Sequence, residues 1–196
     1  MRNVSFHIGD EFVEWDLTDV NVLNGSNGSG KSSLLMKIVD TYQNAGKINY
    51  ICSNYTRVEM DSLLDLLTHN FHNLNAEKQS LFLDVIQRFL CMSGKSLDVS
   101  GGRFLIRHKK TSVDILQSSL GEKRLFLILL TAFLQKEGTL IIDEPEMSLH
   151  TDWQELLIEG IKRVNEELQI IVATHSPSIV INGWHDKVVE ITSIKR

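Results

Sequence analysis

The sequence is poor in the residues that interrupt or cross-link a chain. Among its 196 residues it has two prolines, Pro145 and Pro177, and two cysteines, Cys52 and Cys91. With so little proline, no Pro-rich linker divides the chain. The cysteines have neither CxxC nor metal-ligand spacing, so the sequence excludes a disulfide scaffold and a zinc-finger site. Both cysteines are therefore expected to be free thiols.

The sequence also has no large excess of charge of either sign and no long apolar run. The formal net charge is −5, so no excess of basic residues points to a nucleic-acid partner. The longest apolar run, residues 125–134, contains Thr131 and is too short to cross a bilayer. The first ten residues lack the apolar core of a signal peptide. We therefore expect a cytoplasmic protein that does not associate with a membrane.

Hydrophobic periodicity predicts strands that alternate with helices. An N-terminal hairpin is expected over residues 4–17, with a turn at Gly9. Further strands are expected at 20–23, 48–52, 139–142, 170–173 and 187–191, and helices at 34–42 (ending before Gly46), 121–136 and 153–167. Such alternation indicates an α/β fold, with a mainly parallel sheet covered by helices on both faces.

The middle of the chain interrupts this alternation. Residues 60–93 have helical spacing and residues 97–116 predict short strands, so 60–116 are interpreted as a helical and β-hairpin insertion lobe. The lobe shows no sustained heptad pattern, which excludes a long coiled coil. We expect the whole chain, 1–196, to form one domain that includes this lobe.

A Gly-rich loop carries the strongest chemical signal. Residues 25–32, GSNGSGKS, fit the phosphate-binding pattern G-x-x-x-x-G-K-[ST] and lie between a predicted strand and a predicted helix. In this pattern, backbone N–H groups face phosphate oxygens, the lysine reaches the β- and γ-phosphates, and the following hydroxyl ligates Mg²⁺. The residues predicted to bind ATP here are Asn27, Gly28, Ser29, Gly30, Lys31, Ser32 and Ser33, with Ser32 also a Mg²⁺ ligand.

Two further motifs follow predicted buried strands. Asp143 and Glu144 end the apolar segment 139–142, where Asp143 can hold Mg²⁺ through its water shell and Glu144 can activate the attacking water. His175 follows the strand 170–173 and can contact the γ-phosphate and that water. Read alone, the carboxylates could cap a helix, and the histidine could be a satisfied group at a strand end.

The segment Ser119 to Lys123, SLGEK, supports two interpretations. Ser119 and Glu122 form the capping-box pattern that opens a helix. The same helix start, with Gly121, offers a hydroxyl, backbone N–H groups and a positive dipole end, which together suit an anion. A second anion site in so small a chain suggests that it serves the nucleotide of a neighbouring subunit.

The four motifs, in this order, resemble the ABC-type P-loop ATPases. Within that superfamily they are similar to the branch that contains RecF, the SMC and Rad50 proteins, the OLD nucleases and small defence-system ATPases. The resemblance implies that Lys31 and Ser32 bind phosphate and Mg²⁺, that Asp143 supports Mg²⁺, and that Glu144 is the catalytic base. It also implies that His175 is the switch histidine, and that Ser119 and Gly121 contact ATP held by the opposite subunit of a homodimer.

The sequence departs from the family pattern at three places. Leu120 stands where these proteins usually have Ser or Gly, which makes the contact with the opposite ATP bulkier. No glutamine follows the strand 48–52, and Asn54 is the substitute we consider. His150 stands where transporter ATPases usually have an aspartate.

Three functions follow from these observations. The first is an ATPase module whose ATP-dependent dimerisation switches a partner effector, such as a nuclease, in DNA repair or antiviral defence. The second is the ATP-binding subunit of an ABC transporter, and the third is a nucleotide-dependent DNA clamp. The basic residues available for DNA are Arg103, Arg107, His108, Lys109 and Lys110, which could equally be the solvated tip of a hairpin.

Overall fold

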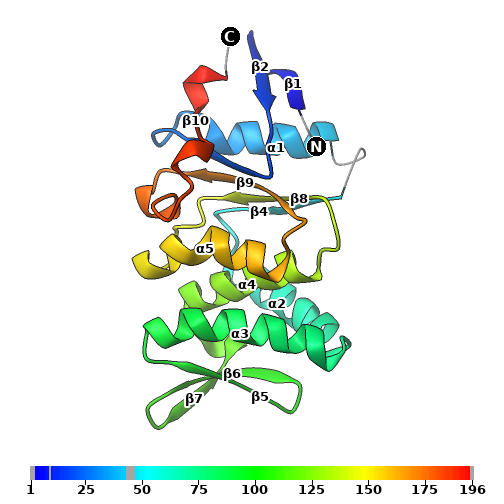
Figure 1. Ribbon diagram of the computed structural model, residues 1–196, viewed down its shortest axis with the longest axis vertical. Helices are drawn as coiled ribbons and strands as arrows, with labels where there is room; N and C mark the ends of the chain where they lie inside the picture. Colours follow the sequence, from blue (N-terminus) through cyan, green and yellow to red (C-terminus); the bar gives the residue numbers. More distant parts are fainter. Residues whose placement is uncertain (1–2, 9, 43–46, 195–196) are drawn as a thin grey trace. The chain divides into compact units, whose positions relative to one another are not determined.

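The computed structural model describes residues 3–8, 10–42 and 47–194 (Figure 1). The predicted turn at Gly9 and the predicted helix stop at Gly46 lie outside these residues. The chain divides into two compact units, the first of residues 1–53, 137–147 and 167–196 and the second of residues 54–136 and 148–166. The second unit contains the whole predicted lobe 60–116. The expectation that 1–196 form one ATPase domain stays a prediction.

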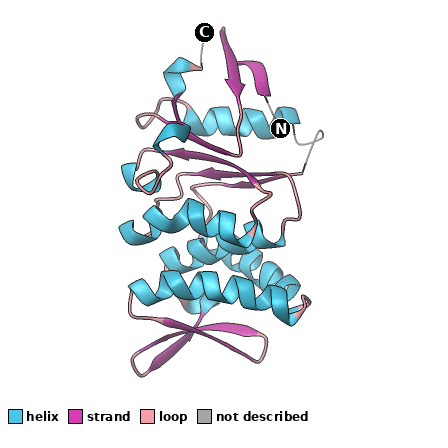
Figure 2. Ribbon diagram, in the orientation of Figure 1, coloured by secondary structure: helices cyan, strands magenta, loops and turns pink. Residues whose placement is uncertain are grey.

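The first unit is built on a five-stranded parallel sheet, drawn as magenta arrows in Figure 2. The strand order is β10 (Val188–Glu190), β3 (Val20–Asn24), β9 (Gln169–Thr174), β8 (Thr139–Asp143) and β4 (Ile48–Ile51). Every residue of β8 is buried, which explains its uninterrupted apolar sequence, as expected for a strand covered on both faces. The prediction of a parallel α/β sheet is confirmed.

The N-terminal hairpin and one helix complete the core of the first unit. β1 (Asn3–Ile8) pairs antiparallel with β2 (Glu11–Asp16), and their alternating residues Val4, Phe6, Val13 and Trp15 are buried, as the period of two requires. Helix α1 (Lys31–Tyr42) places Leu34, Leu35 and Ile38 in the same core. The loop 25–30 joins the end of β3 to the start of α1, and the packing of α1 holds that helix start in place.

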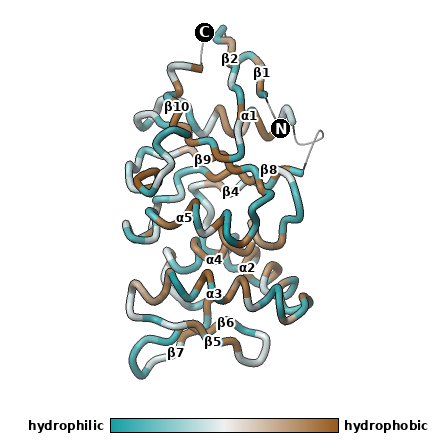
Figure 3. The backbone as a smooth tube through the Cα atoms, in the orientation of Figure 1, coloured by the Kyte–Doolittle hydropathy of each residue, from teal (hydrophilic) through white to brown (hydrophobic). Residues whose placement is uncertain are grey.

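The second unit combines four helices with a small antiparallel sheet. The helices are α2 (Arg57–His72), α3 (Ala76–Met92), α4 (Leu120–Leu134) and α5 (Thr151–Val164), and the strands are β5 (Ser96–Ser100), β6 (Arg103–His108) and β7 (Thr111–Asp114). Hydrophobic residues recur along α3 between hydrophilic ones, as Figure 3 shows. Five phenylalanines from α2, α3, β6 and α4 pack ring against ring in this unit: Phe71, Phe82, Phe104, Phe126 and Phe133.

Two helix ends differ from the prediction. The structure ends α4 at Leu134 and α5 at Val164, whereas the sequence predicted ends at 136 and 167. Asn165 takes an extended backbone with φ of −158°, and its carboxamide donates to the carbonyls of Ala132 and Gln135. These hydrogen bonds satisfy carbonyls at the end of α4 and stop α5 early. None of the helices in the described ranges has both the length and the apolarity needed to span a bilayer.

Candidate nucleotide site

Three strand ends of the first unit meet at one edge of the parallel sheet. The register pairs Asn24 of β3 with Thr174 of β9, and Asp143 of β8 with Ala173 of β9. The loop 25–30, the acidic segment after β8 and His175 therefore begin at neighbouring points. Ligands of open parallel sheets bind at this edge. The structure thus brings together the predicted residues of three motifs from distant parts of the sequence.

The glycines of the loop have the backbone geometry that a phosphate cradle needs. Gly28 and Gly30 have φ of 79° and 93°, which residues with a Cβ rarely adopt. A Cβ on Gly25 would lie 2.8 Å from Ser29 Oγ, so this glycine lets the loop fold on itself. Asn27 and Gly28 are exposed at the loop tip, and Ser29 Oγ is buried without a hydrogen-bond partner among the described residues.

Lys31 lies in an unusual position for a cation. Its residue is only 4% exposed, and its Nζ donates to the carbonyls of Gly25 at 2.6 Å and Ser26 at 3.1 Å. In the described part of the chain, no carboxylate forms an ion pair with it. Burying an ammonium group without a counter-charge is costly. An anion such as a phosphate would supply the missing charge, so this site fits ATP.

The residues expected to hold Mg²⁺ fit a hydrated metal bound with phosphate. Ser32 and Ser33 are exposed in the first turn of α1, next to the loop. Asp143 is buried, and its Oδ2 lies 3.4 Å from Tyr50 Oη and 3.5 Å from Ser53 Oγ. No group of three or more His, Cys, Asp or Glu side chains suited to a metal occurs among the described residues. Mg²⁺ typically uses one or two protein ligands together with phosphates and waters.

A hydroxyl next to the predicted glutamine substitute Asn54 lies near Asp143, and the role of Asn54 as a Mg²⁺ or water contact stays a prediction. Asn54 is exposed and belongs to the second unit. Its neighbour Ser53, in the first unit, places a hydroxyl near the Asp143 carboxylate. Sequence reasoning passed over Ser53 because a small hydroxyl after a strand is also a common turn residue.

Glu144 has a strained backbone. Its φ is 44°, in the left-handed region that non-glycine residues seldom occupy. Its N–H donates to the carbonyl of Ala173 at 2.8 Å, which extends the pairing of β8 with β9 by one residue and holds this conformation. Such strain concentrates at functional sites, where surrounding structure maintains it. The outlier therefore supports a functional role for Glu144 beyond that of an acidic turn.

His175 is held by a residue that sequence reasoning did not select. Glu146 Oε1 accepts from the His175 backbone N–H at 2.9 Å and lies 3.0 Å from Nδ1 of its ring. The Glu144 carboxylate is farther from the same nitrogen, at 4.0 Å. Thr174 Oγ1 accepts from Ser176 N at 2.9 Å and holds the turn that follows β9. Two carboxylates therefore face one imidazole, and only one of them is within hydrogen-bond distance.

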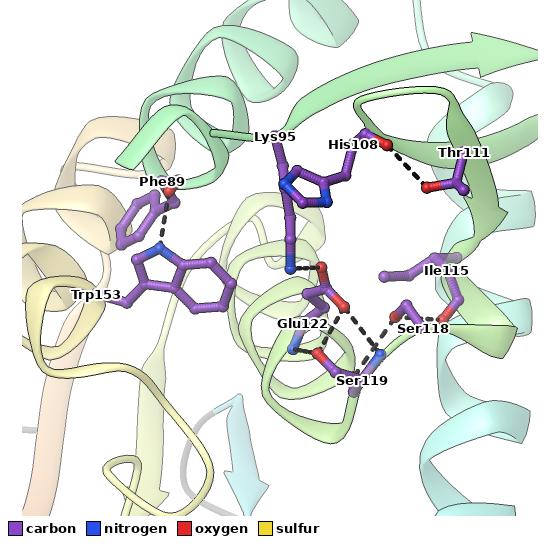
Figure 4. Close-up of polar contacts among 9 residues, drawn as sticks. All are labelled: Phe89, Lys95, His108, Thr111, Ile115, Ser118, Ser119, Glu122 and Trp153. Atoms are coloured by element: carbon purple, nitrogen blue, oxygen red, sulfur yellow. Dashed lines mark hydrogen bonds and ion pairs between the residues drawn. The ribbon is translucent and has the colours of Figure 1, made fainter. Parts of the chain in front are cut away.

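The predicted capping box at Ser119 is confirmed in the second unit (Figure 4). Glu122 Oε2 accepts from the Ser119 hydroxyl at 2.5 Å and from its backbone N–H at 2.8 Å, and Lys95 Nζ donates to Oε1 at 2.8 Å. Burial acts to raise the pKa of Glu122, but the hydrogen bonds from Lys95 and Ser119 and the charge of Lys95 outweigh it. The pKa of Glu122 therefore lies below its ordinary value.

Close packing explains the glycine of the same segment. A Cβ on Gly121 would lie 2.2 Å from the carbonyl oxygen of Ser148, so no larger residue fits here. Leu120 is exposed at the helix start, whereas Lys123 is fully buried and paired with Asp61. The structure thus accounts for Gly121 by contact within the chain, and its predicted contact with a second subunit's ATP stays a prediction.

The structure also shows the environment of His150 and of the two cysteines. His150 is the N-cap of α5, and its Nδ1 accepts from Asp152 N at 3.4 Å. Neither Cys52 nor Cys91 forms a disulfide in the described residues, in agreement with the prediction of reduced cysteines.

The basic stretch lies at the β6–β7 hairpin, and carboxylates partly neutralise it. Arg107 pairs with Asp98 at 2.5 Å, and Arg103 lies 3.8 Å from Asp114. His108 ends β6, and the exposed Lys109 and Lys110 form the turn that follows. Ion pairing within the small sheet reduces the charge available to a phosphate backbone. The two turn lysines are therefore the residues of this stretch that remain suited to nucleic acid.

Comparison with known proteins finds a matching family and a curated relative. The family described as "AAA domain, putative AbiEii toxin, Type IV TA system" matches residues 54–182, which include the acidic segment, His175 and the Ser119 segment. A curated relative, "Retron Ec83 probable ATPase" from Escherichia coli, is 26% identical over 125 residues. That match covers 57% of this chain and 23% of the relative, so the chain spans about a quarter of the relative's length.

Solved structures show the same fold at low sequence identity. An SMC head domain from Thermotoga maritima superposes with a TM-score of 0.59 at 14% identity, covering 91% of this chain and 88% of that one. An ATP-binding protein of an ABC transporter type from Pyrococcus furiosus gives 0.61 at 14% identity, covering 100% and 97%. These matches confirm the predicted P-loop α/β fold of ABC-type ATPases.

Proposed function

This chain belongs to the family described as "AAA domain, putative AbiEii toxin, Type IV TA system" and is an ABC-type ATPase; from this premise we propose how it works. It binds ATP with Mg²⁺ at the sheet edge of its first unit and closes on a second copy of itself. Hydrolysis then reopens the dimer. The alternation between the two states switches a partner effector.

The environment of Lys31 is the observation that carries the ATP site. The side chain is buried, its Nζ is bonded by two neutral carbonyls of the loop, and no carboxylate pairs with it among the described residues. The β- and γ-phosphates would replace these carbonyls and compensate the charge. The positive φ of Gly28 and Gly30 turns the loop backbone as a phosphate cradle requires.

Ser32 and Asp143 would hold Mg²⁺, which neutralises charge on the phosphates when bound. The chain's own groups perform the rest of the reaction. Glu144 accepts a proton from the water that attacks the γ-phosphate, and its strained backbone directs the side chain for this task. His175 Nε2 orients that water or donates to the γ-phosphate. Lys31 and the loop N–H groups stabilise charge on the transferred phosphoryl group.

The helix start at Ser119 supports the proposed dimer. An exposed Leu120, the N–H groups of the first turn of α4 and the hydroxyl of Ser119 lie at a helix N-terminus, which favours anions. Two copies related by a twofold axis would each present this helix start to the other copy's ATP. Because ATP then forms part of the interface, nucleotide and dimer affinity are linked.

The effector is proposed to be a separate protein. The retron name of the curated relative favours antiviral defence over DNA repair. A nuclease is the effector we propose; among the described residues no group of three or more His, Cys, Asp or Glu side chains is suited to the metal that such a reaction would use.

One variant that holds ATP without hydrolysing it and one variant that cannot bind ATP test this function directly. Glu144→Gln should hold ATP and stay closed, while Lys31→Ala should stay empty. Each is tagged, expressed in the native host, and purified with and without Mg²⁺ and ATP. A protein retained by Glu144→Gln with nucleotide and lost from Lys31→Ala supports effector switching. Equal recovery with both variants, or no retained protein with either, would contradict it.

A further inference from the structure

Glu146 is a buried carboxylate to which the motifs of the nucleotide site give no role. It lies three residues after Asp143, beyond the end of β8, and its side chain is 7% exposed. A carboxylate is costly to bury unless hydrogen bonds compensate it. Its Oε2 has no hydrogen-bond partner among the described residues, so compensation comes through Oε1. A group held at such cost is a candidate for a function.

Both contacts of the Glu146 carboxylate in the described part of the chain come from His175. Oε1 accepts from the backbone N–H at 2.9 Å and lies 3.0 Å from the ring nitrogen Nδ1. An ionised carboxylate can only accept, so a hydrogen bond at this distance requires the proton to be on Nδ1. The partner of one ring nitrogen decides the chemistry of the other. Nε2 is then the nitrogen left for the nucleotide.

The geometry separates the roles of the two neighbouring glutamates. Glu144 Oε1 lies 4.0 Å from Nδ1, beyond hydrogen-bond distance, and therefore does not fix the ring. Glu146 fixes both the backbone and the ring of His175 through one oxygen atom.

A second histidine lies near the same site. His185 lines the same cavity of about 410 Å³ as His175, but no hydrogen bond joins the two rings among the described residues.

We propose that Glu146 is a positioning residue for ATP hydrolysis: it anchors His175 with the proton on Nδ1, so that Nε2 faces the γ-phosphate and the attacking water. The inference rests on the proposed function of His175. With Nδ1 occupied, a neutral ring accepts a hydrogen bond from the water at Nε2, and a charged ring donates one to the phosphate. Without Glu146, the ring can rotate and exchange its tautomer, and the nitrogen is misplaced.

Misplacement by about 1 Å costs on the order of 100-fold in rate, so Glu146→Leu should lower kcat by about 10- to 100-fold. The KM for ATP should change little, because Lys31 and the loop still bind the phosphates. Glu146→Gln keeps an oxygen that accepts from both the N–H and Nδ1–H of His175. It should therefore lose less activity than Glu146→Leu, with a fall in kcat below about 10-fold.

A double-mutant cycle separates positioning from support of the fold. Glu146→Leu is measured in the wild type and in His175→Ala, with thermal unfolding of all four proteins as the control for folding. If Glu146 acts through His175, its substitution should have almost no effect on kcat once the ring is absent. An equal loss of kcat in both backgrounds would overturn the proposal. Wild-type protein without ATP turnover would instead contradict the proposed function.

The tautomer of His175 gives a test that does not depend on turnover. In ¹⁵N-labelled protein, the ring nitrogens of His175 are assigned with His175→Ala and observed at a pH where the ring is neutral. The proposal predicts the proton on Nδ1 in the wild type and in Glu146→Gln. It predicts loss of this preference in Glu146→Leu. A wild-type ring protonated on Nε2 would refute the anchoring by Glu146.

Discussion

The hydroxyl of Ser119 donates its proton to Glu122 Oε2 at a distance of 2.5 Å. A hydroxyl has one proton to donate, so a γ-phosphate from a second subunit would compete with Glu122 for it. The other carboxylate oxygen of Glu122 accepts from Lys95 at 2.8 Å (Figure 4). Lys95 lies between α3 and β5, so the segment that joins these elements contributes to the structure of the helix start.

Loss of the Lys95 side chain should destabilise the protein at neutral pH. Lys95→Met removes a charged hydrogen bond from buried Glu122, which costs about 1.5–3 kcal/mol in the free energy of unfolding. The pKa of Glu122 is lowered in the folded protein, so its contribution is present above the unfolded pKa and is lost as pH falls through the folded pKa. The stability difference between variant and wild type should therefore shrink in acid.

Urea unfolding across the acid range measures this difference. Lys78→Met is the matched control, because Lys78 is an exposed lysine of α3 that forms no ion pair in the described residues. It should leave stability within about 0.5 kcal/mol of wild type at every pH. A Lys95→Met effect that is independent of pH would show that the charge of Glu122 is not involved.

Removal of the buried ammonium should abolish nucleotide binding. Lys31→Ala removes the charge that faces the β- and γ-phosphates, and binding of a fluorescent ATP analogue should become undetectable. The fold should survive, because the substitution also removes a buried charge that lacks a counter-ion among the described residues. Lys37→Ala, at an exposed position of the same helix, is the control and should bind as the wild type does. Tight binding by Lys31→Ala would argue against the phosphate cradle.

If Glu144 is the catalytic base, its substitution should stop ATP hydrolysis without preventing ATP binding. Glu144→Gln keeps the shape of the side chain but cannot take a proton, so ATP should bind while kcat falls by about 100-fold or more. Steady-state phosphate release and equilibrium ATP binding, measured on the same sample, check both parts. Glu77→Gln, at an exposed carboxylate of α3, should behave as wild type. Normal turnover by Glu144→Gln would remove Glu144 from the mechanism.

Any binding of duplex DNA by this chain should depend on the turn lysines of the β6–β7 hairpin. Phosphate contacts release counterions, so affinity for duplex DNA should fall steeply with salt, and Lys109→Glu/Lys110→Glu should weaken it strongly. Lys37→Glu/Lys78→Glu makes the same change in net charge elsewhere and should weaken it less. Fluorescence anisotropy with ATP and Mg²⁺ at two salt concentrations measures both. Wild-type affinity in Lys109→Glu/Lys110→Glu would exclude this hairpin from DNA binding.

Local pattern was sufficient to predict most of the fold. Apolar runs such as 139–142 indicated buried strands, and the loop GSNGSGKS fixed the position of α1 after β3. Helix ends were less predictable, because α5 ends at Val164 through hydrogen bonds from Asn165 to residues about thirty positions earlier. No pattern along the sequence reveals such a contact.

In the candidate site, too, contacts between residues far apart in the sequence were not predictable. Glu146 reads in sequence as one more acidic residue of a turn, and its contact with His175 depends on the parallel pairing of β8 with β9. That two strand ends would meet at one edge could be predicted. Which of two glutamates would reach the imidazole could not, because it depends on the left-handed backbone of Glu144.

The proposed dimer predicts opposite behaviour for two variants. Ser119→Arg places a bulky cation at the helix start in place of the hydroxyl, so it should prevent dimerisation and leave ATP binding by the monomer intact. Glu144→Gln should trap the dimer, because hydrolysis no longer opens it. Analytical ultracentrifugation with ATP and with ADP compares them. A dimer of Ser119→Arg as stable as that of Glu144→Gln would show that the helix start lies outside the interface.

The mass of Glu144→Gln in solution with ATP and Mg²⁺ tests the central claim most directly. Size exclusion coupled to light scattering, at tens of micromolar protein, should give twice the 22.3 kDa mass of the chain. With ADP, the same protein should give the mass of one chain, because the γ-phosphate is missing from the interface. A single-chain mass with ATP demonstrably bound would contradict the ATP-dependent homodimer.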